Sequence, residues 1–262
     1  MSGARDGSVD VLEPFDWDTF VTTYWDRRPV LIRAGGLGAA PFDAHEVFEG
    51  AVGATQRPAA GRVGFTLGPR HLADPGDLLP QPEDGSFATY DRRLLGQVGD
   101  ETFALVARGL HATHHPVWLR ARNFLAALWD RTGQPLLGVT TTLCHGTRSP
   151  ARLPSMRAAT FLYTLLGHAR LRLEGGGRWR ATRIEPGDLL YWPAGQRYAV
   201  EPGDRPAAVV HLGIPRTAPQ PGHGLRSVLA PGPNPASPQG LWGGDDILVP
   251  HEAPPDALPP VL

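Results

Sequence analysis

The sequence predicts a mainly β protein with flanking helices, in which short antiparallel strands form a sandwich or barrel. Seven segments between residues 138 and 215 are short, rich in β-branched or aromatic residues, and bounded by Gly or Pro. Strands and turns at such even spacing are typical of all-β sandwiches and barrels. Segments 14–26 and 118–133 come before them with apolar residues at helical spacing, and the second ends at Gly133, a residue type that favours helix termination.

Composition divides the chain into four parts. Residues 1–13 are expected to be a flexible N-terminus, and residues 14–135 to form helices and strands that pack on the barrel. Residues 136–215 are expected to form the barrel, and residues 216–262, dense in Pro and Gly, an irregular C-terminal extension. Within the second part the expected elements are helices near 14–26, 42–52 and 118–133 and strands near 30–32, 63–67 and 101–110.

Charge and residue usage exclude several classes of function. The net charge is −1, and no basic stripe interleaved with aromatic residues is evident, so we expect neither nucleic-acid nor membrane-surface binding. No apolar run reaches the roughly 18 residues of a spanning helix, and no signal-peptide pattern is present, which favours a cytoplasmic location. Cys144 is the single cysteine, which excludes an internal disulfide. All 25 basic residues are arginine, so Schiff-base chemistry on a lysine is excluded.

Four segments in a fixed order carry a family resemblance. They are "FVTTYWDRRPVLIR" from residue 20, "TFLYTLLGHARLRL" from residue 160, "GDLLYWPAGQRY" from residue 187 and "VVHLGIP" from residue 209. This order resembles the Jumonji-C and cupin-like oxygenases, particularly the bacterial branch related to ribosomal oxygenases, over roughly residues 14–215. The resemblance implies a cupin-type double-stranded β-helix, also called a jelly roll.

The resemblance also implies an iron site whose residues this chain has replaced. In that family a His-x-Asp pair and a later His bind Fe(II), and a Lys pairs with 2-oxoglutarate. The corresponding positions here are Pro154 and Met156, then Tyr198, and Ala169 for the lysine. No His-x-Asp or His-x-Glu occurs anywhere in the chain, whereas a facial triad needs two imidazoles and a carboxylate. We therefore expect that Fe(II) and 2-oxoglutarate binding have been lost and that the chain needs no cofactor.

Five residues are candidates for binding a ligand in the barrel. Tyr198 stands where the family has an iron ligand and is the candidate catalytic residue; it either fills the old metal cavity or binds and protonates a ligand. Thr160 and Thr164 lie on one strand face and are expected to line the interior. Arg157 either faces inward and pairs with an anion or lies at the surface. His211, on the last strand, is either structural or pocket-lining.

Two other groups of residues could bind a metal. Cys144, His145 and His211 could supply a substitute ligand set, although a packed thiol beside a hydrogen-bonded histidine is the commoner arrangement. The His-x-x-His-His cluster at 111–115 could bind zinc, but such a cluster more commonly lies in a solvated turn before a proline.

These observations leave two functions in competition. The first is a degenerate cupin that binds a small molecule or peptide, pairs with itself or with a partner enzyme, or catalyses a metal-independent step in a bacterial biosynthetic or modification pathway. The alternative is a metal-dependent oxygenase that uses Fe(II) and 2-oxoglutarate with a rearranged ligand set.

Overall fold

The computed structural model describes residues 9–57, 62–135, 138–148, 157–175, 178–202 and 205–216. The helices are α1 Trp17–Thr23, α2 Ala44–Gln56, α3 Phe87–Val98, α4 Leu110–Thr113 and α5 His115–Thr132. The strands are β1 Asp10–Val11, β2 Val30–Ile32, β3 Arg62–Leu67, β4 Arg70–Leu72, β5 Phe103–Arg108, β6 Thr140–Gly146, β7 Ala158–Leu166, β8 Ala169–Gly175, β9 Arg178–Ile184, β10 Leu189–Trp192, β11 Tyr198–Pro202 and β12 Ala207–Pro215.

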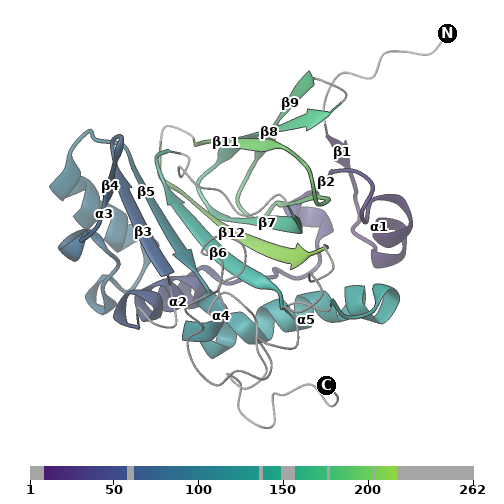
Figure 1. Ribbon diagram of the computed structural model, residues 1–262, viewed down its shortest axis with the longest axis horizontal. Helices are drawn as coiled ribbons and strands as arrows, with labels where there is room; N and C mark the ends of the chain where they lie inside the picture. The colour runs from purple at the N-terminus through teal and green to yellow at the C-terminus, as the bar shows by residue number, and fades with distance from the viewer. Residues whose placement is uncertain are drawn as a thin grey trace, which may run out of the picture.

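The strands form a large and a small sheet that face each other. Within the described part of the chain, the large sheet has nine strands in the order β1-β2-β10-β7-β12-β6-β5-β3-β4, and the small sheet has three in the order β11-β8-β9. All pairs are antiparallel except β1 with β2. The small sheet lies over one face of the large sheet, and helices α2, α4 and α5 cover the other face (Figure 1).

The large sheet takes strands from both sides of residue 135, where the barrel was expected to begin. Strand β5 pairs with β6, and β2 pairs with β10. The strands before residue 136 are therefore hydrogen-bonded into the sheet rather than packed on its outside. Asp10 and Val11, from the segment expected to be flexible, pair with Val30 and Leu31. Residues 1–8 and 217–262, including nearly all of the proposed C-terminal extension, lie outside the described residues.

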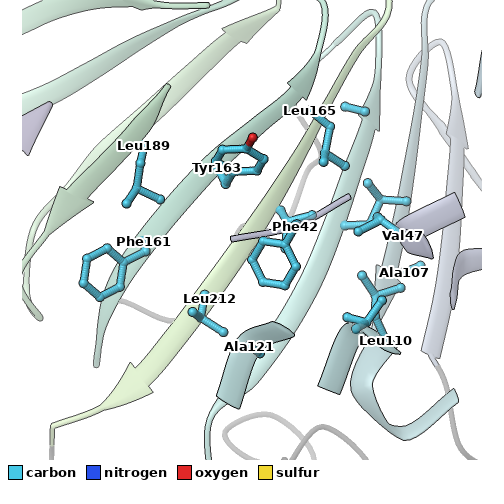
Figure 2. Packing of buried hydrophobic residues seen from close by; sticks show 14 of the residues in the cluster. Phe42, Val47, Ala107, Leu110, Ala121, Phe161, Tyr163, Leu165, Leu189 and Leu212 are labelled. Carbon is cyan, nitrogen blue, oxygen red and sulfur yellow. The ribbon is translucent and has the colours of Figure 1, made fainter. Parts of the chain in front are cut away.

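The alternation of side chains along the central strands creates two cores. On β7, Phe161, Tyr163 and Leu165 point toward the helices, whereas Leu162 points toward the small sheet. Figure 2 shows the helix-side core, where the labelled side chains of β7 lie near Leu212 of β12. Nearly every residue of β7 and β12 is buried, because both faces of the large sheet are covered.

The helices begin and end at residues suited to those positions. Asp16 accepts from the backbone N–H of Thr19 at 2.7 Å to cap α1, and α5 ends at Gly133, as predicted. Helix α2 confirms the helix expected near residues 42–52. Helix α3, which the sequence analysis did not predict, begins at a Ser86 cap and buries Phe87, Tyr90 and Leu94. None of the described helices is both long and apolar enough to span a bilayer.

The Gly187–Asp188 turn fixes the start of β10. The Asp188 carboxylate is 3% exposed and accepts from Arg33 Nη1 at 2.7 Å, from the Ala34 backbone N at 3.1 Å and from the Glu185 backbone N at 2.9 Å. These contacts connect the end of β2 to the turn between β9 and β10. The family-like Gly-Asp pair thus has a structural role in this chain.

Candidate functional site

The apolar core between the large and small sheets is the candidate site. Its lining is mostly apolar and comes from both sheets. The lining includes Leu31, Val106, Cys144, Leu162, Leu171, Leu173, Ile184, Leu190, Trp192 and Val209, with Tyr198 and Val200 packed against them. A polar group that faces this interior is therefore shielded from water and needs a partner.

His211 is such a group. It lies on β12 between Thr142 of β6 and Leu162 of β7, and it is 1% exposed. Neither ring nitrogen finds a hydrogen-bond partner among the residues that the structure describes. Burial lowers the pKa of His211 to about 4, so the imidazole is neutral at pH 7. Leaving a buried polar group unsatisfied costs about 1–3 kcal/mol. A purely structural residue at this position would be expected to be apolar.

Two aromatic rings flank His211. The Trp192 ring lies 6.1 Å from the His211 ring at 79°, and the Tyr198 ring lies 6.4 Å away at 36°. Trp192 and Tyr198 are themselves 4.6 Å apart. Tyr198 belongs to the small sheet, where it pairs with Leu173, and it does face the interior. Burial raises the pKa of Tyr198, so its phenol stays protonated and can act as a donor.

Thr160 and Thr164 share the interior face of β7 with Leu162, and Tyr163 points to the opposite face. Both threonines are buried. Thr160 Oγ1 donates to the Ala158 carbonyl at 3.4 Å. Thr164 Oγ1 has no partner among the described residues. The interior thus contains a buried hydroxyl as well as a buried imidazole without hydrogen-bond partners.

Arg157 does not join these residues. It is exposed in the turn before β7, and its carbonyl accepts from the Arg216 backbone N at 3.2 Å. Leu162 pairs with His211, and Arg157 lies five residue steps before Leu162, which is about 16 Å at the usual rise per residue of a strand. Of the two alternatives for Arg157, the structure favours the surface position.

Arg108 faces the interior, although the sequence analysis did not select it. It ends β5 on the same face as Val106, which belongs to the interior core. Arg108 pairs with Thr142, and Thr142 pairs with His211, so the three form one row across β5, β6 and β12. Arg108 is half-buried, and no carboxylate of the described residues lies within ion-pair distance of it. The alternation in "FALVAR" could have indicated this position.

Cys144 and His145 lie on opposite faces of β6, so the substitute metal set does not assemble. Cys144 faces the interior beside Val209, and burial raises the pKa of its thiol to about 12. His145 faces the helices, and its Nε2 lies 2.7 Å from Asp91 Oδ1. Three aromatic rings surround His145 on that side, those of Phe87, Tyr90 and Phe103. Among the described residues no group of three possible metal ligands comes together.

His111 lies in α4, His115 begins α5 and His114 connects the two helices, which corrects the expectation of a solvated turn. His111 is 1% exposed in α4, and its Nδ1 lies 2.8 Å from Thr141 Oγ1. His114 Nε2 lies 3.2 Å from Glu49 Oε2 of α2. These contacts give His111 and His114 roles in joining the helices to each other and to β6.

A cleft of about 130 Å³ lies at the edge of the small sheet and shares Leu173 with the interior. Its lining consists of Val9, Asp10, Arg28, Pro29, Leu173, Glu174, Arg180 and Gln196. Arg28 pairs with Asp10 at 2.9 Å, and Glu174 pairs with Arg197 at 3.0 Å. Three of the four charged lining residues are thus paired, whereas Arg180 has no ion-pair partner among the described residues.

The facing antiparallel sheets define a cupin-type double-stranded β-helix, as the sequence predicted. The chain is similar to solved structures of the ribosomal oxygenase YcfD from Escherichia coli. One, in complex with cobalt and 2-oxoglutarate, matches with a TM-score of 0.53 and 14% identity over 88% of this chain and 63% of that chain. Another matches with a TM-score of 0.51 and 14% identity over the same shares.

These comparisons bear on the fold alone, because the identity is low. The chain spans 63% of the length of the YcfD chains that it matches. No protein-family model matches the sequence, and no curated protein is similar to it in sequence.

Proposed function

We propose that this chain binds a small molecule or peptide between the large and small sheets, without Fe(II) or 2-oxoglutarate. The observation that carries the proposal is His211, a neutral and fully buried imidazole whose two nitrogens have no partner among the described residues. A neutral imidazole offers one donor and one acceptor. A ligand in the interior would satisfy both and would offset the desolvation of His211.

The residue types that face the interior also support a function without iron. Strands β5, β6, β7, β10 and β12 contain neither Asp nor Glu. Residues 149–156, where the family's His-x-Asp would lie, read "SPARLPSM" and contain no His, Asp or Glu. The interior imidazole of His211, a protonated thiol and hydroxyls do not fit the two imidazoles and one carboxylate of a facial triad.

A metal-independent reaction is the second candidate function, and the pairing of His211 with Tyr198 favours it. The neutral imidazole offers a proton acceptor, and the phenol, whose ring is 6.4 Å away, offers a donor. Burial makes the imidazole a weaker base and the phenol a weaker acid than in water, so a bound substrate would have to bring both pKa values closer to neutral. A substrate beside the two rings would therefore meet a proton acceptor and a proton donor. A homodimer or a partner enzyme stays an expectation from the sequence alone.

Metal analysis of the purified protein tests the proposal against the metal-dependent alternative. We expect substoichiometric Fe, Mn, Ni and Zn, and no rise in melting temperature when Fe(II) and 2-oxoglutarate are added without oxygen, since a ligand that binds the native state stabilises it. A stoichiometric metal, or a rise that depends on both additions, would overturn the proposal in favour of the oxygenase. The His211→Phe variant is the matched control, because it would lose metal only if His211 were a ligand.

A further inference from the structure

From the row formed by Arg108, Thr142 and His211, we infer that the interior ligand is a small anion whose negative group pairs with Arg108. This inference rests on the proposed function and specifies its ligand class. Arg108 and His211 lie on either side of Thr142, with one strand between them. Adjacent strands are about 4.8 Å apart, so a ligand of a few atoms can span from the guanidinium to the imidazole.

The charge around this row is one-sided. Strands β5, β6, β7, β10 and β12 carry no acidic residue, and Arg108 has no carboxylate partner within the described ranges. Asp188, the buried carboxylate before β10, is occupied by Arg33 and two backbone N–H groups. A half-buried guanidinium without a counter-charge is unfavourable, and a carboxylate or phosphate of the ligand would supply that charge.

The remaining groups of the row suit an anion with an apolar body. Thr142 lies between the Arg108 guanidinium and the His211 imidazole and has a hydroxyl that can donate. Trp192 and Tyr198 cover the His211 side with aromatic surface. Arg108 also lies on a different strand from Ala169, the β8 residue that stands at the family's lysine position. The positive charge of Arg108 therefore reaches the interior from a different strand than the family's lysine would.

Paired charged and neutral probes test the inference. Succinate and inorganic phosphate at millimolar concentration are compared with succinamide, by thermal shift and by calorimetric titration of the full chain. We expect one of the two anions to bind and the neutral amide not to bind. The response to succinate against phosphate distinguishes a carboxylate from a phosphate ligand.

Variants connect the binding to Arg108. Arg108→Gln should weaken anion binding by about 10- to 100-fold, the value of a hydrogen bond to a charged group. Arg108→Lys, which keeps the charge, should retain part of the affinity that Arg108→Gln loses. Arg92→Gln, at an exposed position on α3, is the matched control and should bind as the unmodified chain does. Each variant is compared with its own melting temperature without probe, so a change in stability does not obscure the result.

Three results would overturn the inference. They are equal binding of succinamide and succinate, unchanged anion binding by Arg108→Gln, and no anion binding by the unmodified chain. If succinamide binds and His211→Phe abolishes that binding, the proposed function stands, but the ligand need not be an anion. Failure of the proposed function itself would appear separately, as stoichiometric metal in the purified protein.

Discussion

The ring of His211 lies edge-on to that of Trp192, with centroids 6.1 Å apart and planes at 79°. This contact places an imidazole against an aromatic surface and away from hydrogen-bond partners. The two residues belong to β12 and β10, which lie on either side of β7. The arrangement gives His211 an unfavourable environment in the empty protein and leads to the first prediction.

His211→Phe should stabilise the protein. Phenylalanine keeps the ring contacts and removes two unsatisfied nitrogens, so we expect a gain of about 1–2 kcal/mol. For a chain of this size this corresponds to a rise of about 3–6 °C in melting temperature. The same change at exposed His45 should have almost no effect. A fall in melting temperature for His211→Phe would mean that the imidazole makes a stabilising contact in the empty protein.

The stability of the protein should depend on the protonation of His211. Its folded pKa of about 4 lies below the ordinary value of 6.5. Between these values the unfolded chain binds a proton that the folded chain does not, so the free energy of unfolding falls as the pH is lowered from 6.5 to about 4. This loss amounts to about 3 kcal/mol at the lower end, and it is absent above pH 6.5.

Unfolding curves from pH 7 to pH 4 for the unmodified chain and for His211→Phe measure this effect. Other titrating groups contribute equally to both proteins, so the difference between the curves isolates His211. The gain in stability of His211→Phe should therefore widen as the pH falls. Parallel curves would show that the imidazole titrates normally.

Gly187→Ala should destabilise the protein more than Gly195→Ala. Both glycines have a positive φ, +86° and +84°, which costs an L-residue about 1 kcal/mol. At Gly187 an added Cβ would also lie 2.8 Å from the Ala34 Cβ, whereas at Gly195 it would meet no atom within 4 Å. Chemical denaturation of both variants gives the comparison. Equal losses would indicate that the turn before β10 shifts freely.

Asp188→Ala should cost about 3 kcal/mol, because it removes a buried acceptor from one arginine and two backbone donors. Arg33→Ala should cost less, since Arg33 is 41% exposed. The double variant should lose less than the sum of the two single losses, because the residues interact directly. Strict additivity in this cycle would argue against the ion pair in solution.

Cys144 should resist thiol reagents in the folded protein. Burial raises the pKa of Cys144 to about 12, so almost no thiolate is present at pH 8. One equivalent should react at once after unfolding, because the chain has a single cysteine. Rapid labelling of the folded chain would show that the interior opens to solvent on the side of β5 and β6. Protection by a bound anion would then locate the ligand there.

The strands after residue 138 could be predicted because their signals are local. β-branched and aromatic residues, bounded by Gly and Pro, place β6 to β12 in the expected order. The sequence did not predict helix α3, because its apolar residues stand in a segment rich in Gly, Pro and charge. The helix begins at the Ser86 cap, and its apolar side is buried by packing against α2. Alternation along β6 should already have separated Cys144 from His145, since neighbouring residues of a strand face opposite sides.

The sequence by itself determined the succession of strands and turns along the chain, including the motif from Gly187 to Tyr198, because each depends on contiguous residues. The position of Tyr198 in the interior followed from the same motif. The tertiary structure alone decided that Arg108, Thr142 and His211 form one row and that His211 lies without partners. Registers between strands far apart in the chain are set by packing and by ladder hydrogen bonds, and no local pattern specifies them.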